Sequence, residues 1–237
     1  MNINITCINR ISDYRECSVP TLYVTSVREV PDFLRSKGEA VCIHINDESK
    51  LSDFDSYKYF TTGDVQYSGH LNMVYCHIKN IPFVIAQDDS ILIREECPED
   101  LDKIYEMYED PECRRFLEPL PPSDSVLTPE SRFESVKNGY MLFGYGMWIV
   151  EEKSTGEVIG RAGFEYQDEN TVSLGFMIRS DKRKKGYARN ACLLCLNYLK
   201  DSLPDMKVTA KCSQANEASL KVLSGLSGIL PIEILII

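Results

Sequence analysis

Five basic side chains lie close to one glycine between residues 182 and 189. The group consists of Lys182, Arg183, Lys184, Lys185, Arg189 and Gly186. A glycine lets the backbone approach a ligand, because it has no Cβ. The first N–H groups of a helix lack partners within the helix and attract anions, and nearby cations strengthen that attraction. The spacing therefore predicts a phosphate-binding loop at the start of a helix.

A strand must end just before this loop, and a helix must begin within it. Residues Thr171–Ile178 are largely apolar and predict the strand, and Arg189–Leu199 continue the helix with one apolar face. Two earlier segments, Gly146–Glu152 and Val158–Tyr166, predict strands joined by turn sequences. The loop would thus follow the last of three neighbouring strands.

The segment from Arg183 to Ala188, with the sequence RKKGYA, resembles the acyl-CoA motif Q/R-x-x-G-x-G/A of the GNAT N-acetyltransferase superfamily. The flanking segments agree with the family in order and spacing. Leu174–Ile178 looks like its fourth strand, Met206–Cys212 looks like its fifth, and Asn216–Leu223 matches the N-x-x-S-x-x-x-L signature of its last helix. The resemblance covers residue 90 to about residue 226.

This resemblance implies an α/β (α+β) fold for residues 89–237, with a mixed, mostly antiparallel GNAT-type sheet flanked by helices. It implies that acetyl-CoA is the co-substrate and that a primary amine attacks its thioester directly. The acceptor would be a small-molecule amine or a protein N-terminus. The alternative is a non-catalytic acyl-CoA-binding or regulatory protein of the same fold.

The family's binding roles can be carried over to matching positions. The resemblance implies that the backbone of Phe176, Met177 and Ile178 binds the pantetheine arm, and that Asn216 and Ser219 lie near the pantetheine and the phosphates. The residues implied at the pyrophosphate are Arg183, Lys184, Lys185, Gly186, Tyr187, Ala188 and Arg189.

The general base is harder to assign, because Ser173 stands where many relatives carry a glutamate. A base must take a proton from the ammonium form of the acceptor. The candidates on neighbouring strands are Glu165 and Glu151, with Glu152 beside them. A base that acts through a water molecule is the alternative.

The last residues depart from the family pattern. Gly228-Ile229 is the nearest match to the G-F pair of relatives, and no tyrosine follows Tyr198 to protonate the leaving thiolate. Ile232–Ile237 predict one strand where relatives have two, so we expect a truncated or divergent end. An apolar edge strand needs a cover, which makes a homodimer an expectation.

Residues 1–88 predict a separate small α/β domain of unknown role. Strands are predicted at Thr21–Thr25 and Ala40–Ile45, and helices at Pro31–Ser36 and Gly69–Lys79. Neither a G-x-G-x-x-G nor a G-x-x-x-x-G-K-S motif occurs in them. The sequence therefore indicates no chemistry in this part of the chain.

The composition argues against several classes of protein. Lys and Arg total 26 against 36 Asp and Glu, and the net charge of −10 argues against a nucleic-acid partner. No apolar run approaches the ~20 residues of a membrane span, so no membrane partner is expected. The first residues lack the pattern of a secretory signal. We expect a cytoplasmic protein.

No metal site is expected. The nine cysteines form no framework of paired spacings, which favours reduced thiols. Cys192 and Cys195 have C-x-x-C spacing, but they lie in an apolar helix with no second ligand pair, so core thiols are the better interpretation. His44, His70 and His77 show no ligand pattern and are taken as structural.

Overall fold

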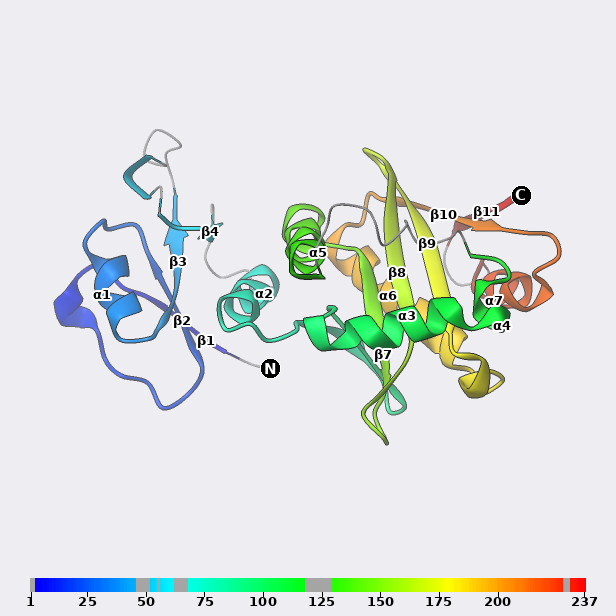
Figure 1. Cartoon of the computed structure of the whole chain (residues 1–237). Coiled ribbons are helices and arrows are strands. Elements are labelled where there is room, and N and C mark those ends of the chain that lie inside the picture. The colour runs from blue at the N-terminus through cyan, green and yellow to red at the C-terminus, as the bar shows by residue number, and fades with distance from the viewer. Residues whose placement is uncertain (1–2, 46–51, 55, 62–67, 118–128, 228–230) are drawn as a thin grey trace. The chain divides into compact units, whose positions relative to one another are not determined.

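The computed structural model describes residues 3–45, 52–54, 56–61, 68–117, 129–227 and 231–237. The chain forms two compact units, Met1–Phe83 and Val84–Ile237 (Figure 1). None of the helices in the described ranges is long and apolar enough to cross a membrane.

The first unit is a parallel sheet with strand order β1-β2-β3-β4. Its elements are β1 (Asn4–Cys7), a short 3-10 helix (Ile11–Asp13), β2 (Thr21–Thr25), α1 (Val30–Ser36), β3 (Ala40–His44), β4 (Phe60–Thr61) and α2 (Ser68–Ile78). All five residues of β2 are buried, as expected for a strand inside a parallel sheet. The expected small α/β domain is therefore present, with β1 as an additional edge strand that the sequence analysis missed.

The second unit contains a seven-stranded sheet with strand order β11-β10-β9-β8-β7-β6-β5. The strands are β5 (Val84–Gln87), β6 (Ile91–Arg94), β7 (Met147–Glu152), β8 (Glu157–Asp168), β9 (Thr171–Ile178), β10 (Lys207–Cys212) and β11 (Ile232–Ile236). Pairing is antiparallel from β5 to β9 and parallel from β9 to β11. This is the mixed, mostly antiparallel sheet that the sequence predicts.

The chain divides five residues earlier than the expected boundary after residue 88. β5 pairs with β6 as a hairpin, so Val84–Gln87 belong to the second sheet. Asp88 forms the hairpin turn, because its Oδ1 accepts hydrogen bonds from the N–H groups of Ser90 (2.7 Å) and Ile91 (2.8 Å). The polar residues 87–90 therefore mark a tight turn and not a link between domains.

Helices cover both faces of the large sheet (Figure 1). They are a 3-10 turn (Pro98–Asp100), α3 (Leu101–Glu109), α4 (Pro111–Arg114), α5 (Pro129–Phe143), a second 3-10 turn (Ser180–Lys182), α6 (Tyr187–Ser202) and α7 (Glu217–Ser227). Ile149 and Met177 pack with α3 and α4, whereas Trp148 and Phe164 pack with α6. Alternate residues of a strand point to opposite faces, so α3 and α6 lie on opposite sides.

Contacts with the sheet explain features of two helices. α5 contains Gly139 and continues to Phe143, because Tyr140 is buried and donates a hydrogen bond to the Met147 carbonyl (2.7 Å). In α6, Cys192 and Cys195 are fully buried, which confirms that they are core thiols.

One residue from each of the neighbouring strands β7, β8 and β9 lies in register across the sheet, and two of the three are glycines. Gly163 of β8 pairs with Met147 of β7 and Gly175 of β9. A Cβ at Gly163 would lie 2.0 Å from the carbonyl oxygen of Gly146, and one at Gly175 would lie 3.4 Å from the Met147 sulfur. The Met147 side chain thus crosses Gly163 and reaches β9.

The end of β7 holds the loop that leads into α6. Glu152 is buried and accepts hydrogen bonds from Lys182 Nζ (2.7 Å) and from the Tyr187 hydroxyl. Lys182 also donates to Glu157 at 2.5 Å. These hydrogen bonds, with a further one from Thr155, lower the pKa of Glu152 to about 2. Lys182 and Tyr187, on either side of residues 183–186, are therefore both bound to Glu152 at the end of β7.

The crowding at Gly163 gives a first prediction. Gly163→Ala should destabilise the protein by about 2–3 kcal/mol or more, because the added Cβ has no space beside Gly146. Gly225→Ala is the matched control: this helical glycine has nothing within 4 Å, so alanine should stabilise by about 0.5–1 kcal/mol. Urea unfolding followed by the fluorescence of Trp148 measures both. Equal effects of the two substitutions would contradict this description.

The Glu152 network gives a pH-dependent prediction. The folded-state pKa of about 2 lies below the ordinary value of 4.5. The carboxylate therefore contributes its full stability above about pH 4.5 and loses it as the pH falls toward 2. Glu152→Gln should lower the Tm at pH 7, and the difference from the parent should shrink by pH 3. Glu157→Gln, which leaves the contacts of Glu152 in place, should show a smaller change. A difference that is the same at both pH values would count against this role.

Candidate functional site

β9 and β10 separate after three residue pairs. Thr171–Ser173 pair with Lys207–Thr209, and β10 otherwise pairs with β11. The rest of β9, Leu174–Ile178, pairs only with β8 within the described part of the chain. Backbone groups of this stretch that point away from β8 are therefore available to a ligand. The strand predicted to bind the pantetheine arm thus has an open edge.

The expected strand residues lie at this edge. Phe176 packs on the α6 side of the sheet, and Met177 packs on the side of α3 and α4. The carbonyl of Ile178 accepts a hydrogen bond from Arg183 Nε (3.1 Å). The N–H of Arg179 donates to the Ile159 carbonyl of β8 (2.9 Å), so in this antiparallel pair Met177 also directs its backbone groups at β8. Phe176, next to it, presents its backbone groups to the open edge close to the loop.

The loop after β9 turns sharply into α6. Lys184 and Gly186 both have left-handed backbone conformations, with φ of +63° and +84°. Gly186 is the N-cap of α6, and a Cβ built on it would meet nothing within 4 Å. The N–H groups of Tyr187, Ala188 and Arg189 form the first turn, where a helix has no internal acceptors. This end of α6 is therefore an open, electropositive position suited to an anion.

The five cations of this region have two different tasks. Lys184, Lys185 and Arg189 are exposed around the start of α6. Lys182 is bound to Glu152 and Glu157, and its own side chain is 11% exposed. The structure thus corrects the expectation that all five surround an anion.

Arg183 also has a structural task. Besides Ile178, its guanidinium donates to the carbonyl of Glu112 (3.2 Å) and lies 3.3 Å from the sulfur of Cys113. Its side chain is therefore directed at β9 and α4, and it ties the loop to both. Only its position in the loop matches what the motif implies.

Side chains at the starts of α6 and α7 fix these helices. Asn190 Nδ2 donates to Asp88 Oδ2 (3.0 Å), which fastens the first turn of α6 to the β5–β6 hairpin. Asn216 precedes α7, and its Oδ1 accepts a hydrogen bond from the N–H of Ser219 (3.2 Å). That is an N-cap contact. Asn216 and Ser219 therefore lie together at the junction of β10 and α7.

The three candidate carboxylates occupy different ends of the sheet. Glu165 is exposed on β8 and pairs with Ser173, on the same face as Gly163. Glu151 lies near the end of β7, where its Oε2 accepts from Arg94 Nε (2.9 Å). Because β7 and β9 run in the same direction, Glu151 and Glu152 lie toward the loop before α6. Glu152 is committed to Lys182 and Tyr187, so it is no longer a candidate base.

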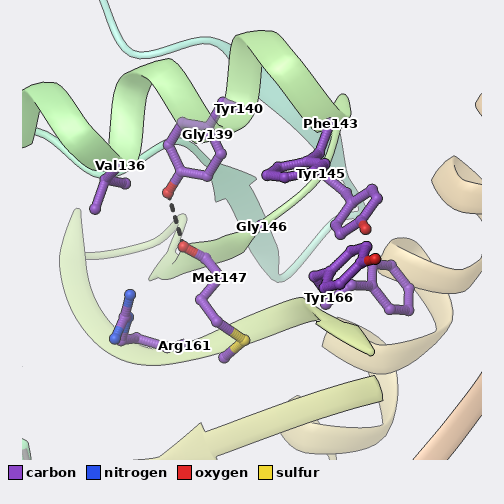
Figure 2. Close-up of a pocket in the computed structure, with 10 residues that line it drawn as sticks. Val136, Gly139, Tyr140, Phe143, Tyr145, Gly146, Met147, Arg161 and Tyr166 are labelled. Carbon is purple, nitrogen blue, oxygen red and sulfur yellow. Dashed lines mark hydrogen bonds between the residues drawn. The ribbon is translucent and has the colours of Figure 1, made fainter. Parts of the chain in front are cut away.

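A hollow of about 220 Å³ lies where α5 faces β7 and β8 (Figure 2). The described residues that line it include Val136, Tyr140, Phe143, Met147, Arg161 and Tyr166. The resemblance to the family also implies that residues 119–126 line an acceptor pocket, and these residues lie outside the described ranges. The sequence analysis missed this hollow, although an arginine inside the apolar strand Ile159–Phe164 is an unusual feature for a buried position.

Residues 90–226 match the family model described as the acetyltransferase (GNAT) domain. The chain is 26% identical over 136 residues to YkkB of Bacillus subtilis strain 168, which covers 55% of this chain and 77% of YkkB. It is 25% identical over 141 residues to the N-acetyltransferase p20 of Bacillus licheniformis, which covers 59% of this chain and 79% of p20. A solved structure of yncA from Salmonella typhimurium with its cofactor acetyl-CoA is 20% identical, with a TM-score of 0.44, and the match covers 57% of this chain and 78% of that one.

The family model spans more than half of the chain and includes the separated strands, the open glycine and the N-cap of α7. The chain therefore belongs to the GNAT acetyltransferase family and is an acetyl-CoA-dependent acyltransferase.

Proposed function

We propose that the second unit transfers an acetyl group from acetyl-CoA to a primary amine, by direct attack of that amine on the thioester. The observation that carries this proposal is the continuity of the site. The open edge of β9 is followed, after the loop that Lys182 and Arg183 hold in place, by the open start of α6. A long ligand with an anionic end fits this path, because the strand offers backbone hydrogen bonds and the helix offers positive charge.

The proposed contacts follow the path from strand to helix. The open edge at Phe176, beside Met177, binds the pantetheine arm through the Phe176 backbone, and the N–H groups from Gly186 to Arg189 bind the pyrophosphate. Asn216 and Ser219 stand on the other side, at the start of α7. Lys184 and Lys185 add exposed positive charge beside the phosphates. Bound acetyl-CoA supplies the thioester carbonyl that the amine attacks.

Glu165 is the proposed general base. It is exposed and lies opposite Ser173 on β9. One residue pair, Phe164 with Leu174, separates it from the pair Gly163–Gly175. Glu151 is a weaker proposal, because Arg94 holds its carboxylate and it lies toward the phosphate end. Glu165 takes the proton from the acceptor's ammonium group directly or through water, which leaves the neutral amine that can attack. A backbone N–H of β9 polarises the carbonyl oxygen. As the C–N bond forms, the C–S bond of the thioester breaks and CoA leaves as the thiolate, which takes up the second proton lost by the amine nitrogen directly or through water.

The acceptor is a small-molecule amine or a protein N-terminus. A homodimer is a further proposal. β11 is an edge strand of the sheet, and Ile236 at its end is 54% exposed. Pairing with a second copy would cover this apolar edge.

Removal of the three exposed cations should weaken cofactor binding. We expect the variant Lys184→Gln, Lys185→Gln, Arg189→Gln to bind acetyl-CoA about 10- to 100-fold more weakly, because each exposed cation near a phosphate contributes about 0.5–1 kcal/mol. The loss should shrink at high salt, since exposed charges are screened. Calorimetric titration measures this. Lys200→Gln, in the last turn of α6, should bind normally. Equal binding by the triple variant and the parent would contradict the placement of the phosphates.

Replacement of Glu165 tests the base. Glu165→Gln should lower kcat/KM for amine acetylation about 10²- to 10⁴-fold and leave acetyl-CoA binding unchanged. The rise of kcat/KM with pH, which reports the free base, should be lost as well. Glu169→Gln, in the turn between β8 and β9, is the matched control and should behave as the parent. Unchanged turnover in Glu165→Gln would exclude Glu165, and cofactor binding without turnover of any amine would favour a non-catalytic binding protein.

A further inference from the structure

Arg161 is a buried cation with an unused hydrogen-bond donor. Its residue is 8% exposed, and its guanidinium donates to Glu96 Oε2 at 3.1 Å. Its Nε atom is buried and has no hydrogen-bond partner among the described residues. Buried N–H groups are almost always paired, so this one needs an acceptor such as a water molecule or a ligand atom. The missing partner must be an acceptor, because arginine has only donors.

This donor lies at one end of the hollow between α5, β7 and β8. Figure 2 shows Arg161 and Val136 at one end, Phe143, Tyr145 and Tyr166 at the other, and Met147 between them. The rings of Phe143 and Tyr166 lie 5.8 Å apart and are 42% and 57% exposed. The hollow thus has a polar end and an aromatic rim.

The volume limits what the hollow can hold. Pockets for whole ligands measure ~300–1,000 Å³, and this hollow measures about 220 Å³. It therefore suits one residue-sized part of a larger acceptor, or a single small acceptor.

The hollow adjoins the strand that carries the reaction. Met147 reaches Gly175, which lies in the open stretch of β9, and Arg161 pairs with Met177 of the same stretch. The Arg161 side chain extends across β7 to Glu96, whereas the Met147 side chain extends in the other direction to β9. Both line the same hollow, so a residue that fills the hollow can direct its amine along Met147 toward β9 and its carbonyl oxygen toward Arg161.

We infer that the acceptor is an α-amino carbonyl compound, and that Arg161 donates a hydrogen bond from Nε to its carbonyl oxygen. This inference rests on the proposed function. Arg161 already forms an ion pair with Glu96 (3.1 Å), so a neutral carbonyl fits its remaining N–H better than a second carboxylate. The acceptor is thus an amide of an amino acid or the first residue of a peptide, and a free amino acid is disfavoured. Its apolar side chain packs on Phe143 and Tyr166.

The test compares acceptors that share an amine and a side chain. Leucinamide and a peptide with N-terminal leucine carry the neutral carbonyl, leucine carries a carboxylate, and 3-methylbutylamine carries neither. Each is assayed with the parent and with Arg161→Met, Glu96→Gln, a double variant that removes both charges of this ion pair together. The ratio of parent to variant is compared for each acceptor, so differences in intrinsic amine reactivity cancel.

The double variant should lose about 10- to 100-fold in kcat/KM for leucinamide or for the peptide, the usual range for a lost hydrogen bond to a charged donor. 3-Methylbutylamine should change less than about threefold. Arg161→Lys keeps the charge but lacks Nε–H, and it should show the same selective loss. Tyr166→Ala should affect leucinamide and 3-methylbutylamine alike, since both carry the side chain.

A loss that is equal for all acceptors, or no loss for any, overturns the inference. So does a parent protein that acetylates none of the carbonyl-bearing acceptors. Calorimetric titration of acetyl-CoA into the same proteins distinguishes a failure of this inference from a failure of the proposed function. Normal cofactor binding then leaves the proposed function standing without this acceptor class, and no binding by the parent removes the proposed function itself. The peptide and leucinamide distinguish a chain terminus from a free amide, and a selective loss with either supports the inference.

Discussion

The separation of β9 from β10 is the constraint on which the rest of the second unit depends. A strand inside a sheet uses its backbone groups on both sides, and so it has none to offer a ligand. Here β10 pairs with β9 over three residues and then with β11 alone, so Leu174–Ile178 keep one free side.

An open edge is useful only if the loop that follows it is held firmly. Two cations of the basic run provide this: Lys182 binds the end of β7, and Arg183 binds Ile178 and the backbone of α4. Their neighbours Lys184 and Lys185 stay at the surface. A stretch of similar charges thus combines anchoring and ligand attraction. The division between the two tasks follows from which side chains find carboxylate or carbonyl partners.

Local pattern predicted the elements well, because turn chemistry and alternating side chains determine them nearby in sequence. The strand Thr171–Ile178 has the expected bounds, and the loop and α6 follow as expected. Contacts between distant residues were not predictable. The pairing of Lys182 with Glu152 spans 30 positions, and the contact of Arg161 with Glu96 spans 65. Only the fold brings such residues together. The extension of α5 past Gly139 has the same origin, since the partner of Tyr140 is on β7.

The hydrogen bond between Asn190 and Asp88 links the first strand of the second unit to the start of α6. β5 is the first element after the boundary between Phe83 and Val84, and it is only four residues long. The turn at its end carries Asp88, which accepts a hydrogen bond from Asn190 in the first turn of α6. The covalent connection from the N-terminal unit therefore enters the second unit through one short strand, and the turn after that strand is hydrogen-bonded to the helix start that would hold the phosphates.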